Sequence, residues 1–127
     1  MIVIDASAII DVVAENERAL DILDKIETSS LFAPHIIDFE VLSGVRGMLL
    51  GRDLDDVKAQ SAIDYFYTFD IQRFEAAPLA QRIWELRHQF TSYDASYIAL
   101  AEHLDCPLIT SDKKLATSGH NAEVLVF

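Results

Sequence analysis

Two acidic residues follow short apolar segments of this 127-residue chain, where they can carry chemistry. Asp5 comes directly after the apolar segment 2–4, and Asp112 comes two residues after the apolar segment 107–110. If these segments are strands of a parallel sheet, both acids stand at its carboxyl edge, where ligands of such sheets collect. Taken singly, each acid is better explained as a helix cap or a first-turn acid favoured by the helix dipole.

Two further acids stand on predicted helices. Glu40 lies within a mostly apolar helix from about 35 to 50, where no capping role is available and the cost of burial calls for a partner or a cation. Asp94 has a structural explanation, because Thr91 and Asp94 have capping-box spacing. The residues after Asp94 are apolar on nearly every side, which is typical of an internal helix.

The joint pattern is more informative than its members. Four carboxylates at strand ends and helix faces repel one another unless cations lie between them. A set rich in carboxylates and free of Cys and His suits hard ions such as Mg²⁺ or Mn²⁺. Such ions activate water and stabilise a phosphodiester under attack, so the pattern points to hydrolysis of nucleic acid.

The charge of the chain agrees with this interpretation only if metal takes part. Asp and Glu total 21 against 10 Lys and Arg, a net charge of −11. Nucleic acid held by electrostatics alone requires a basic protein. Either nucleic acid is not the ligand, or metal ions bring the positive charge.

The composition excludes several other classes of protein. Hydrophobic residues make up 51% of the chain, which excludes a disordered protein. The single cysteine, Cys106, excludes a disulfide framework and a cysteine-based zinc site, and the four histidines show no metal-ligand spacing. We expect a cytoplasmic protein without a membrane span, because an acid at position 5 precedes any signal-peptide core and no apolar run approaches about 20 residues.

Alternating apolar segments and helical patterns predict one α/β domain over residues 1–127. The predicted strands cover 2–4, 31–33, 67–74, 107–110 and 123–127, and the predicted helices cover 6–14, 16–26, 35–50, 53–65, 75–90, 92–104 and 111–116. Such alternation is typical of a mainly parallel sheet covered on both faces. Within these helices we expect Leu20, Met48 and Trp84 to face the core, and Pro34 to stand at a helix start. Trp84 and the aromatic segment 65–67 are predicted to serve the core or a subunit contact, with base stacking as the alternative.

The chain resembles the PIN-domain family, most closely the small VapC-type toxins of prokaryotic toxin–antitoxin pairs. The resemblance spans essentially the whole chain. Its most specific parts are YDASYIALAE at 93–102 and PLITSDKKL at 107–115, with IDASA at 4–8 as a weaker part. It implies a three-layer sandwich with a mainly parallel sheet of four or five short strands.

The resemblance also implies an endoribonuclease that uses one or two Mg²⁺ or Mn²⁺ ions. The positions that match the acidic cluster of the family are Asp5, Glu40, Asp94 and Asp112. Asp5 and Asp94 would hold the principal ion, and Glu40 and Asp112 would complete the cluster or orient water. Asp38 remains an alternative to Glu40, because two residues apart on a helix they face different sides.

Other positions take supporting roles in the same comparison. Ser7 and Thr110 match small hydroxyl positions that support the acids or metal-bound water. Arg46, Lys113 and Lys114 are candidates for contacts with the RNA backbone, with a solvated surface as the alternative. The expected partners are RNA, a second copy of the chain, and a VapB-type antitoxin that forms a heterotetramer or larger complex by placing a basic side chain in the acidic site.

Two other functions compete with the nuclease. A non-catalytic PIN scaffold would bind RNA or a protein without cleavage, and the complete set of four acids argues against it. A phosphoryl-transfer domain of receiver type needs an acid directly after a central strand and a lysine after a later one. No acid follows the predicted strand 31–33, and Asp94 lies in a helix.

Overall fold

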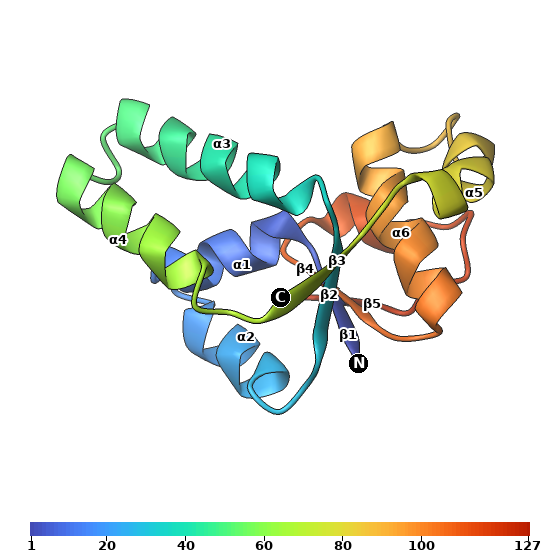
Figure 1. Cartoon of the computed structure of the whole chain (residues 1–127), viewed down its shortest axis with the longest axis horizontal. Coiled ribbons are helices and arrows are strands. Elements are labelled where there is room, and N and C mark those ends of the chain that lie inside the picture. The colour runs from blue at the N-terminus through green and yellow to red at the C-terminus, as the bar shows by residue number, and fades with distance from the viewer.

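A parallel sheet stands between two layers of helices in the computed structural model, which describes all residues from Met1 to Phe127 (Figure 1). The five strands are β1 (Ile2–Ile4), β2 (Leu31–Pro34), β3 (Ile71–Phe74), β4 (Leu108–Thr110) and β5 (Val124–Val126). They lie in the order β3-β2-β1-β4-β5, and every neighbouring pair is parallel. The predicted α/β sandwich is therefore confirmed.

Six α-helices and two short 3-10 helices connect the strands. They are α1 (Ala6–Val13), α2 (Ala19–Ile26), α3 (Ile37–Leu50), α4 (Asp56–Phe66), η1 (Ala77–Leu79), α5 (Ala80–Glu85), α6 (Ser92–Leu104) and η2 (Lys113–Ala116). Helices α1 to α4 lie on one side of the sheet in Figure 1, and α5 and α6 lie on the other. None of the helices has the length and apolar character that crossing a membrane requires.

The core forms where the sheet meets α1 and α6. All of β1 is buried, and so is every α6 residue from 95 to 101. This burial confirms that the helix after Asp94 is internal, as its apolar pattern predicted. The start of α6 therefore lies at the boundary between the core and the surface.

Several predicted boundaries were wrong. Pro34 ends β2 instead of starting a helix, and the next N–H along the chain, that of His35, continues the ladder by donating to Phe74 O at 3.1 Å. The helix predicted from 53 begins at Asp56, because the Asp55 carboxylate caps it by accepting from Lys58 N at 2.8 Å. The strand predicted from 67 begins at Ile71.

The helix predicted over 75–90 is also shorter than expected. The segment contains Pro78, which lies in the 3-10 turn η1, and regular helix covers only Ala80–Glu85. The Leu86 N–H donates to both Arg82 O and Ile83 O at 3.2 Å, so the last turn tightens and the helix ends.

Two predicted core residues lie on the surface. Leu20 is 78% exposed, because Ile22 and Ile26 define the inward face of α2 and a residue two positions away points elsewhere. Trp84 is 63% exposed on the short helix α5, where the Arg87 guanidinium lies 4.7 Å from its ring centroid. In the aromatic segment 65–67, Phe66 is fully buried and Tyr67 is 53% exposed.

The Thr91 side chain caps the N-terminus of α6, and its contribution to stability can be measured by substitution. Thr91 Oγ1 accepts from the Asp94 N–H at 3.2 Å. We expect Thr91→Ala to lower the free energy of unfolding by about 1 kcal/mol, because it leaves that N–H without its acceptor. Urea unfolding measures the change, and Thr91→Ser, which keeps a hydroxyl, is the control. Equal stability of the alanine variant and wild type would contradict this role.

Candidate active site

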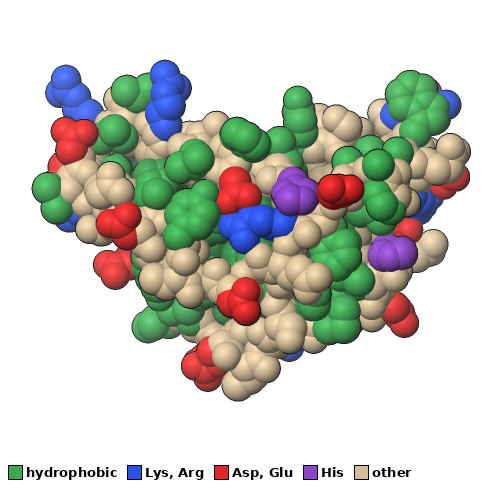
Figure 2. Space-filling model, in the orientation of Figure 1, with side chains coloured by type: hydrophobic (Ala, Val, Ile, Leu, Met, Phe, Trp, Pro, Cys, Tyr) green, Lys and Arg blue, Asp and Glu red, His purple; other side chains and the backbone are tan.

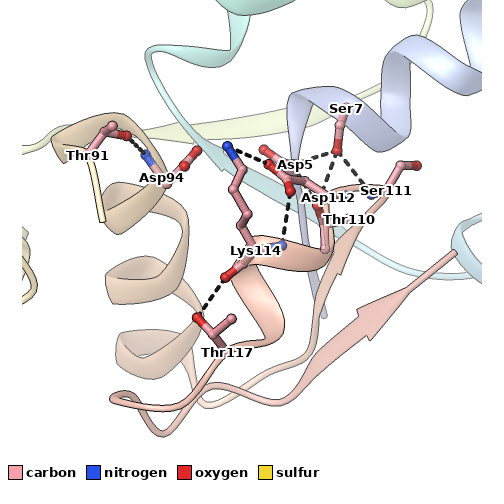
Figure 3. A network of polar contacts seen from close by, with 9 residues as sticks. All are labelled: Asp5, Ser7, Thr91, Asp94, Thr110, Ser111, Asp112, Lys114 and Thr117. Atoms are coloured by element: carbon pink, nitrogen blue, oxygen red, sulfur yellow. Dashed lines mark hydrogen bonds and ion pairs between the residues drawn. The ribbon is translucent and has the colours of Figure 1, made fainter. Parts of the chain in front are cut away.

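Asp5 is the buried centre of the candidate site. It follows β1 and is only 6% exposed, and its own N–H donates to Ile109 O at 2.9 Å. Its carboxylate does not cap α1. Instead, Oδ2 accepts from the Ser7 hydroxyl at 2.6 Å and from the Thr110 hydroxyl at 2.7 Å (Figure 3). The capping explanation for Asp5 therefore fails, and Ser7 and Thr110 lie where a supporting role requires.

The loop after β4 is held against the same group of residues. The Ser7 hydroxyl accepts from Ser111 N at 3.0 Å, and the Thr110 hydroxyl accepts from Asp112 N at 2.9 Å. Asp112 caps η2 through Oδ1, which accepts from Lys114 N at 3.0 Å. Its capping role is therefore real, and the loop geometry also brings it beside Asp5, as Figure 3 shows.

The structure separates Glu40 from the alternative acid Asp38. Asp38 forms a bidentate ion pair with Arg73 at 2.7 and 2.8 Å and accepts from the Tyr67 hydroxyl at 2.9 Å. The Arg73 hydrogen bonds lower the pKa of Asp38, so this acid is committed to a structural pair. Glu40 instead accepts from the buried Tyr97 hydroxyl at 2.8 Å on the side of α3 that faces the other acids.

Asp94 completes the group from the first turn of α6. Thr91 caps the helix through the Asp94 backbone, so the carboxylate of Asp94 is not used in the cap. The side chain is half-buried, and the Thr91 hydroxyl and the Lys114 charge both act to lower its pKa. Figure 3 shows it directed toward Asp5 and Asp112.

The electrostatics show that the acids act on one another. Burial is the main cause that raises the pKa of Asp5, and the charge of Asp112 adds to it. Burial also raises the pKa of Glu40, with contributions from Asp5 and Asp94. The pKa of Asp94 rises for the same reason, with contributions from Asp5 and Asp112. Four acids from distant parts of the chain thus share one electrostatic environment.

The donor set fits a hard divalent cation. The groups that could ligate an ion are carboxylate and hydroxyl oxygens, and Asp5 Oδ1 accepts no side-chain hydrogen bond. As they stand, no three His, Cys, Asp or Glu side chains converge closely enough to hold an ion.

The predicted RNA contacts differ in their position. The Lys114 Nζ lies 3.6 Å from Asp112 Oδ2, and its charge lowers the pKa of Asp94, so Lys114 belongs to the acidic site. Lys113 is exposed and has no polar partner. Arg46 is exposed toward the end of α3, where Figure 2 shows Lys and Arg side chains on the upper left rim, and it contacts none of the four acids.

Sequence reasoning missed two residues that support the site. The apolar pattern of its helix predicts only that Tyr97 is buried, although its hydroxyl also donates a hydrogen bond to Glu40. Asp11 on α1 accepts from the Ser111 hydroxyl at 2.5 Å and from Asn16 Nδ2 at 2.7 Å, and so fixes the loop before Asp112. No local signal identifies either residue, since their partners are 57 and 100 positions away in the chain.

The sequence matches the PIN domain over residues 2–119. The chain belongs to the PIN-domain family. Ribonuclease VapC9 of Mycobacterium tuberculosis is 35% identical over 119 residues, which are 94% of this chain and 91% of the relative. Ribonuclease VapC12 of the same organism is 34% identical over 125 residues, 98% of this chain and 97% of the relative.

Solved structures share the PIN fold of this chain at low sequence identity. VapBC2 from Rickettsia felis, solved with a DNA fragment from its promoter, aligns with a TM-score of 0.72 at 17% identity, over 100% of this chain and 99% of the matched chain. VapC20 of Mycobacterium tuberculosis, a toxin that cleaves the sarcin-ricin loop, aligns with a TM-score of 0.68 at 16% identity, over 95% and 97%.

The raised pKa of Asp5 makes a prediction about stability. Above this raised pKa the folded protein carries a buried charge that the unfolded chain carries more easily, so ionisation lowers the free energy of unfolding. The penalty fades as the pH falls through the folded pKa toward the ordinary value of 3.8. At pH 7 in chelator, Asp5→Asn should therefore melt at a higher temperature than wild type.

Thermal unfolding of both proteins from pH 4 to pH 7.5 in chelator measures this difference. The difference in melting temperature between Asp5→Asn and wild type should become smaller as the pH falls. Asp24→Asn, on the exposed face of α2, is the matched control for the loss of one negative charge. A gap that widens on acidification would show that burial does not control the ionisation of Asp5.

Proposed function

We propose that this protein is a metal-dependent endoribonuclease that hydrolyses RNA phosphodiester bonds and acts as the toxin of a toxin–antitoxin pair. The observation that carries the proposal is the group of four carboxylates at one edge of the sheet, where Asp5, Glu40 and Asp94 have raised pKa values. Such a concentration of charge is typical of a site built around cations. Relatives named VapC ribonucleases, similar over nearly the whole chain, support the same activity.

Each acid has a distinct role in this proposal. Asp5 and Asp94 would hold the principal Mg²⁺ or Mn²⁺ ion, and Glu40 and Asp112 would complete the cluster or orient water. When bound, the ion acts as a Lewis acid that polarises the phosphate and makes its bound water more acidic. Ser7 and Thr110 hold Asp5 through Oδ2 and leave Oδ1 free to bind a cation.

The surrounding cations would position the RNA backbone. Lys114 stands beside Asp112, where its ammonium can meet a phosphate that enters the site. Lys113 and Arg46 are exposed and form no ion pair with a carboxylate, so contact with a phosphate would break no existing ion pair. Because the chain carries a net charge of −11, these few cations and the bound metal together would supply the attraction for phosphate.

A toxin requires a partner that restrains it. The Rickettsia felis structure contains both VapB and VapC, with promoter DNA. By analogy, this single PIN domain would act in the cytoplasm as a homodimer and bind a VapB-type antitoxin in a heterotetramer or a larger complex. A basic side chain of the antitoxin, such as Arg, would neutralise the carboxylates by bidentate hydrogen bonding.

The central test is the cleavage of total cellular RNA by the purified protein. We expect discrete fragments with Mg²⁺ or Mn²⁺ and none with EDTA. Asp94→Asn should reduce the cleavage rate by about 100-fold or more, because several kcal/mol of metal-dependent charge stabilisation depend on the cluster. Sequencing of the fragment ends then identifies the RNA target.

Control variants separate the site from the fold. Asp24→Asn removes an exposed acid on α2 and should cleave as wild type does. Asp38→Asn tests the alternative acid of α3, and it should lower stability through the loss of the Arg73 pair while it spares metal-dependent cleavage. Folded, antitoxin-free wild type that cuts no RNA in either metal would favour the non-catalytic scaffold instead.

The RNA contacts make a separate prediction about salt. In an Asp94→Asn background, the affinity for a labelled single-stranded oligoribonucleotide should fall with salt, and Lys113→Ala or Arg46→Ala should each reduce the slope of log K against log salt by about 0.7. Fluorescence anisotropy across a salt series measures the slopes. Lys25→Ala, on the distant helix α2, should leave the slope unchanged. Unchanged slopes for Lys113→Ala and Arg46→Ala would make them ordinary surface cations.

A further inference from the structure

Tyr97 is a fully buried tyrosine whose hydroxyl reaches the carboxylate group from inside the protein. Its side chain is 0% exposed, and its hydroxyl donates to Glu40 Oε1 at 2.8 Å. Tyr97 comes three residues after Asp94 on α6, and Glu40 lies on α3. This single hydrogen bond therefore joins the two helices that carry acids of the site.

We propose that Tyr97 is a positioning residue of the site, whose hydroxyl holds the Glu40 carboxylate on the side of α3 that faces Asp5 and Asp94, where it would help to bind a divalent cation. The inference rests on the proposed metal-dependent ribonuclease function. The proposed role falls to a residue outside the four acids and outside the Ser7 and Thr110 hydroxyls that hold Asp5.

Packing alone does not account for the hydroxyl. The buried segment 95–101 of α6 otherwise consists of Ala, Ile, Leu and one Ser, so the surroundings of Tyr97 on this helix are almost entirely apolar. Phenylalanine would fill nearly the same volume without a polar atom. A buried tyrosine needs a hydrogen-bond partner, and here the partner is an acid of the site.

The same arrangement recurs at two other acids. Asp5 is held through Oδ2 by two hydroxyls, and Asp112 is held through Oδ1 by the Lys114 N–H. Tyr97 does for Glu40 what the two hydroxyls do for Asp5, since it occupies one oxygen and leaves the other without a side-chain donor. Donors of this kind fix the orientation of metal-binding side chains.

Glu40 depends on such a donor more than the aspartates do. A glutamate side chain has one more rotatable bond than an aspartate, so more conformational freedom is lost when it is fixed. Glu40 is also only half-buried, so packing does not fix it. Without the Tyr97 hydroxyl, the negative charges of Asp5 and Asp94 would repel the Glu40 side chain and turn it away from the site.

The test measures Mn²⁺ binding to the purified full-length protein by electron paramagnetic resonance or calorimetry. Tyr97→Phe removes only the hydroxyl, and we expect Mn²⁺ binding to weaken about 10-fold to 100-fold. Tyr65→Phe is the matched control, because Tyr65 is a partly buried tyrosine on α4 that packs against Phe69 and lies outside the site. Its Mn²⁺ affinity should equal that of wild type.

A double-mutant cycle separates positioning from a general loss of structure. In a Glu40→Gln background, Tyr97→Phe should change Mn²⁺ affinity by less than about 2-fold, because the hydroxyl acts through Glu40. Equal losses in the wild-type and Glu40→Gln backgrounds would overturn the proposal. Glu40→Asp, which shortens the side chain away from Tyr97, extends the test if Tyr97→Phe does not fold. Wild-type Mn²⁺ affinity in Glu40→Asp would overturn the proposal as well.

The outcomes also distinguish this inference from the function on which it rests. Wild-type protein that neither binds Mn²⁺ nor cleaves RNA would overturn both. Wild-type protein that does both, while Tyr97→Phe binds Mn²⁺ equally well, would overturn only the role of Tyr97.

Discussion

Asp5 is buried, and Glu40 and Asp94 are half-buried, at one edge of the sheet, so the fold must bear the cost of carboxylates that are partly removed from water. Burial and neighbouring negative charge raise the pKa values of Asp5, Glu40 and Asp94, which means that their ionised forms destabilise the fold. Hydroxyl and backbone donors offset part of this free-energy cost, because each of them donates a hydrogen bond to one carboxylate oxygen. The remaining oxygens form a site that a divalent cation would stabilise.

The strand order explains how acids so distant in sequence meet. Strand β1 is central, with β2 on one side and β4 on the other, so Asp5 emerges between the segments that lead to α3 and to η2. Helix α6 packs against the sheet and brings its first turn to the same edge (Figure 1). The edge that collects ligands in parallel α/β sheets is therefore the edge that collects these four acids.

The two kinds of acid in this chain are separated by the sign of their pKa shifts. Arg73 lowers the pKa of Asp38 through a bidentate pair. Partial burial is the largest single influence on Glu102 and acts to raise its pKa, but the hydrogen bonds from Arg82 and from the Asn121 N–H, together with the charge of Arg82, outweigh it and the pKa is lowered. These pairs stabilise the ionised carboxylates within the fold. The acids of the site have no such cation in the chain, apart from the exposed Lys114, so a bound cation would stabilise them more than it would Asp38 or Glu102.

Patterns in the amino-acid sequence predicted the α/β architecture, the internal position of α6, its Thr91 cap and the strand-end positions of Asp5 and Asp112. The elements and the cap follow from periodicity and capping chemistry, which act over a few residues, and the positions of the two acids follow from the general rule for ligand sites in parallel sheets. Long-range contacts turn Glu40 instead of Asp38 toward the other acids. They also give Tyr97 and Asp11 their supporting roles and leave Trp84 exposed. The physical reason is that these outcomes depend on hydrogen bonds and packing between segments far apart in the chain, such as the bond that joins Tyr97 to Glu40 across 57 positions.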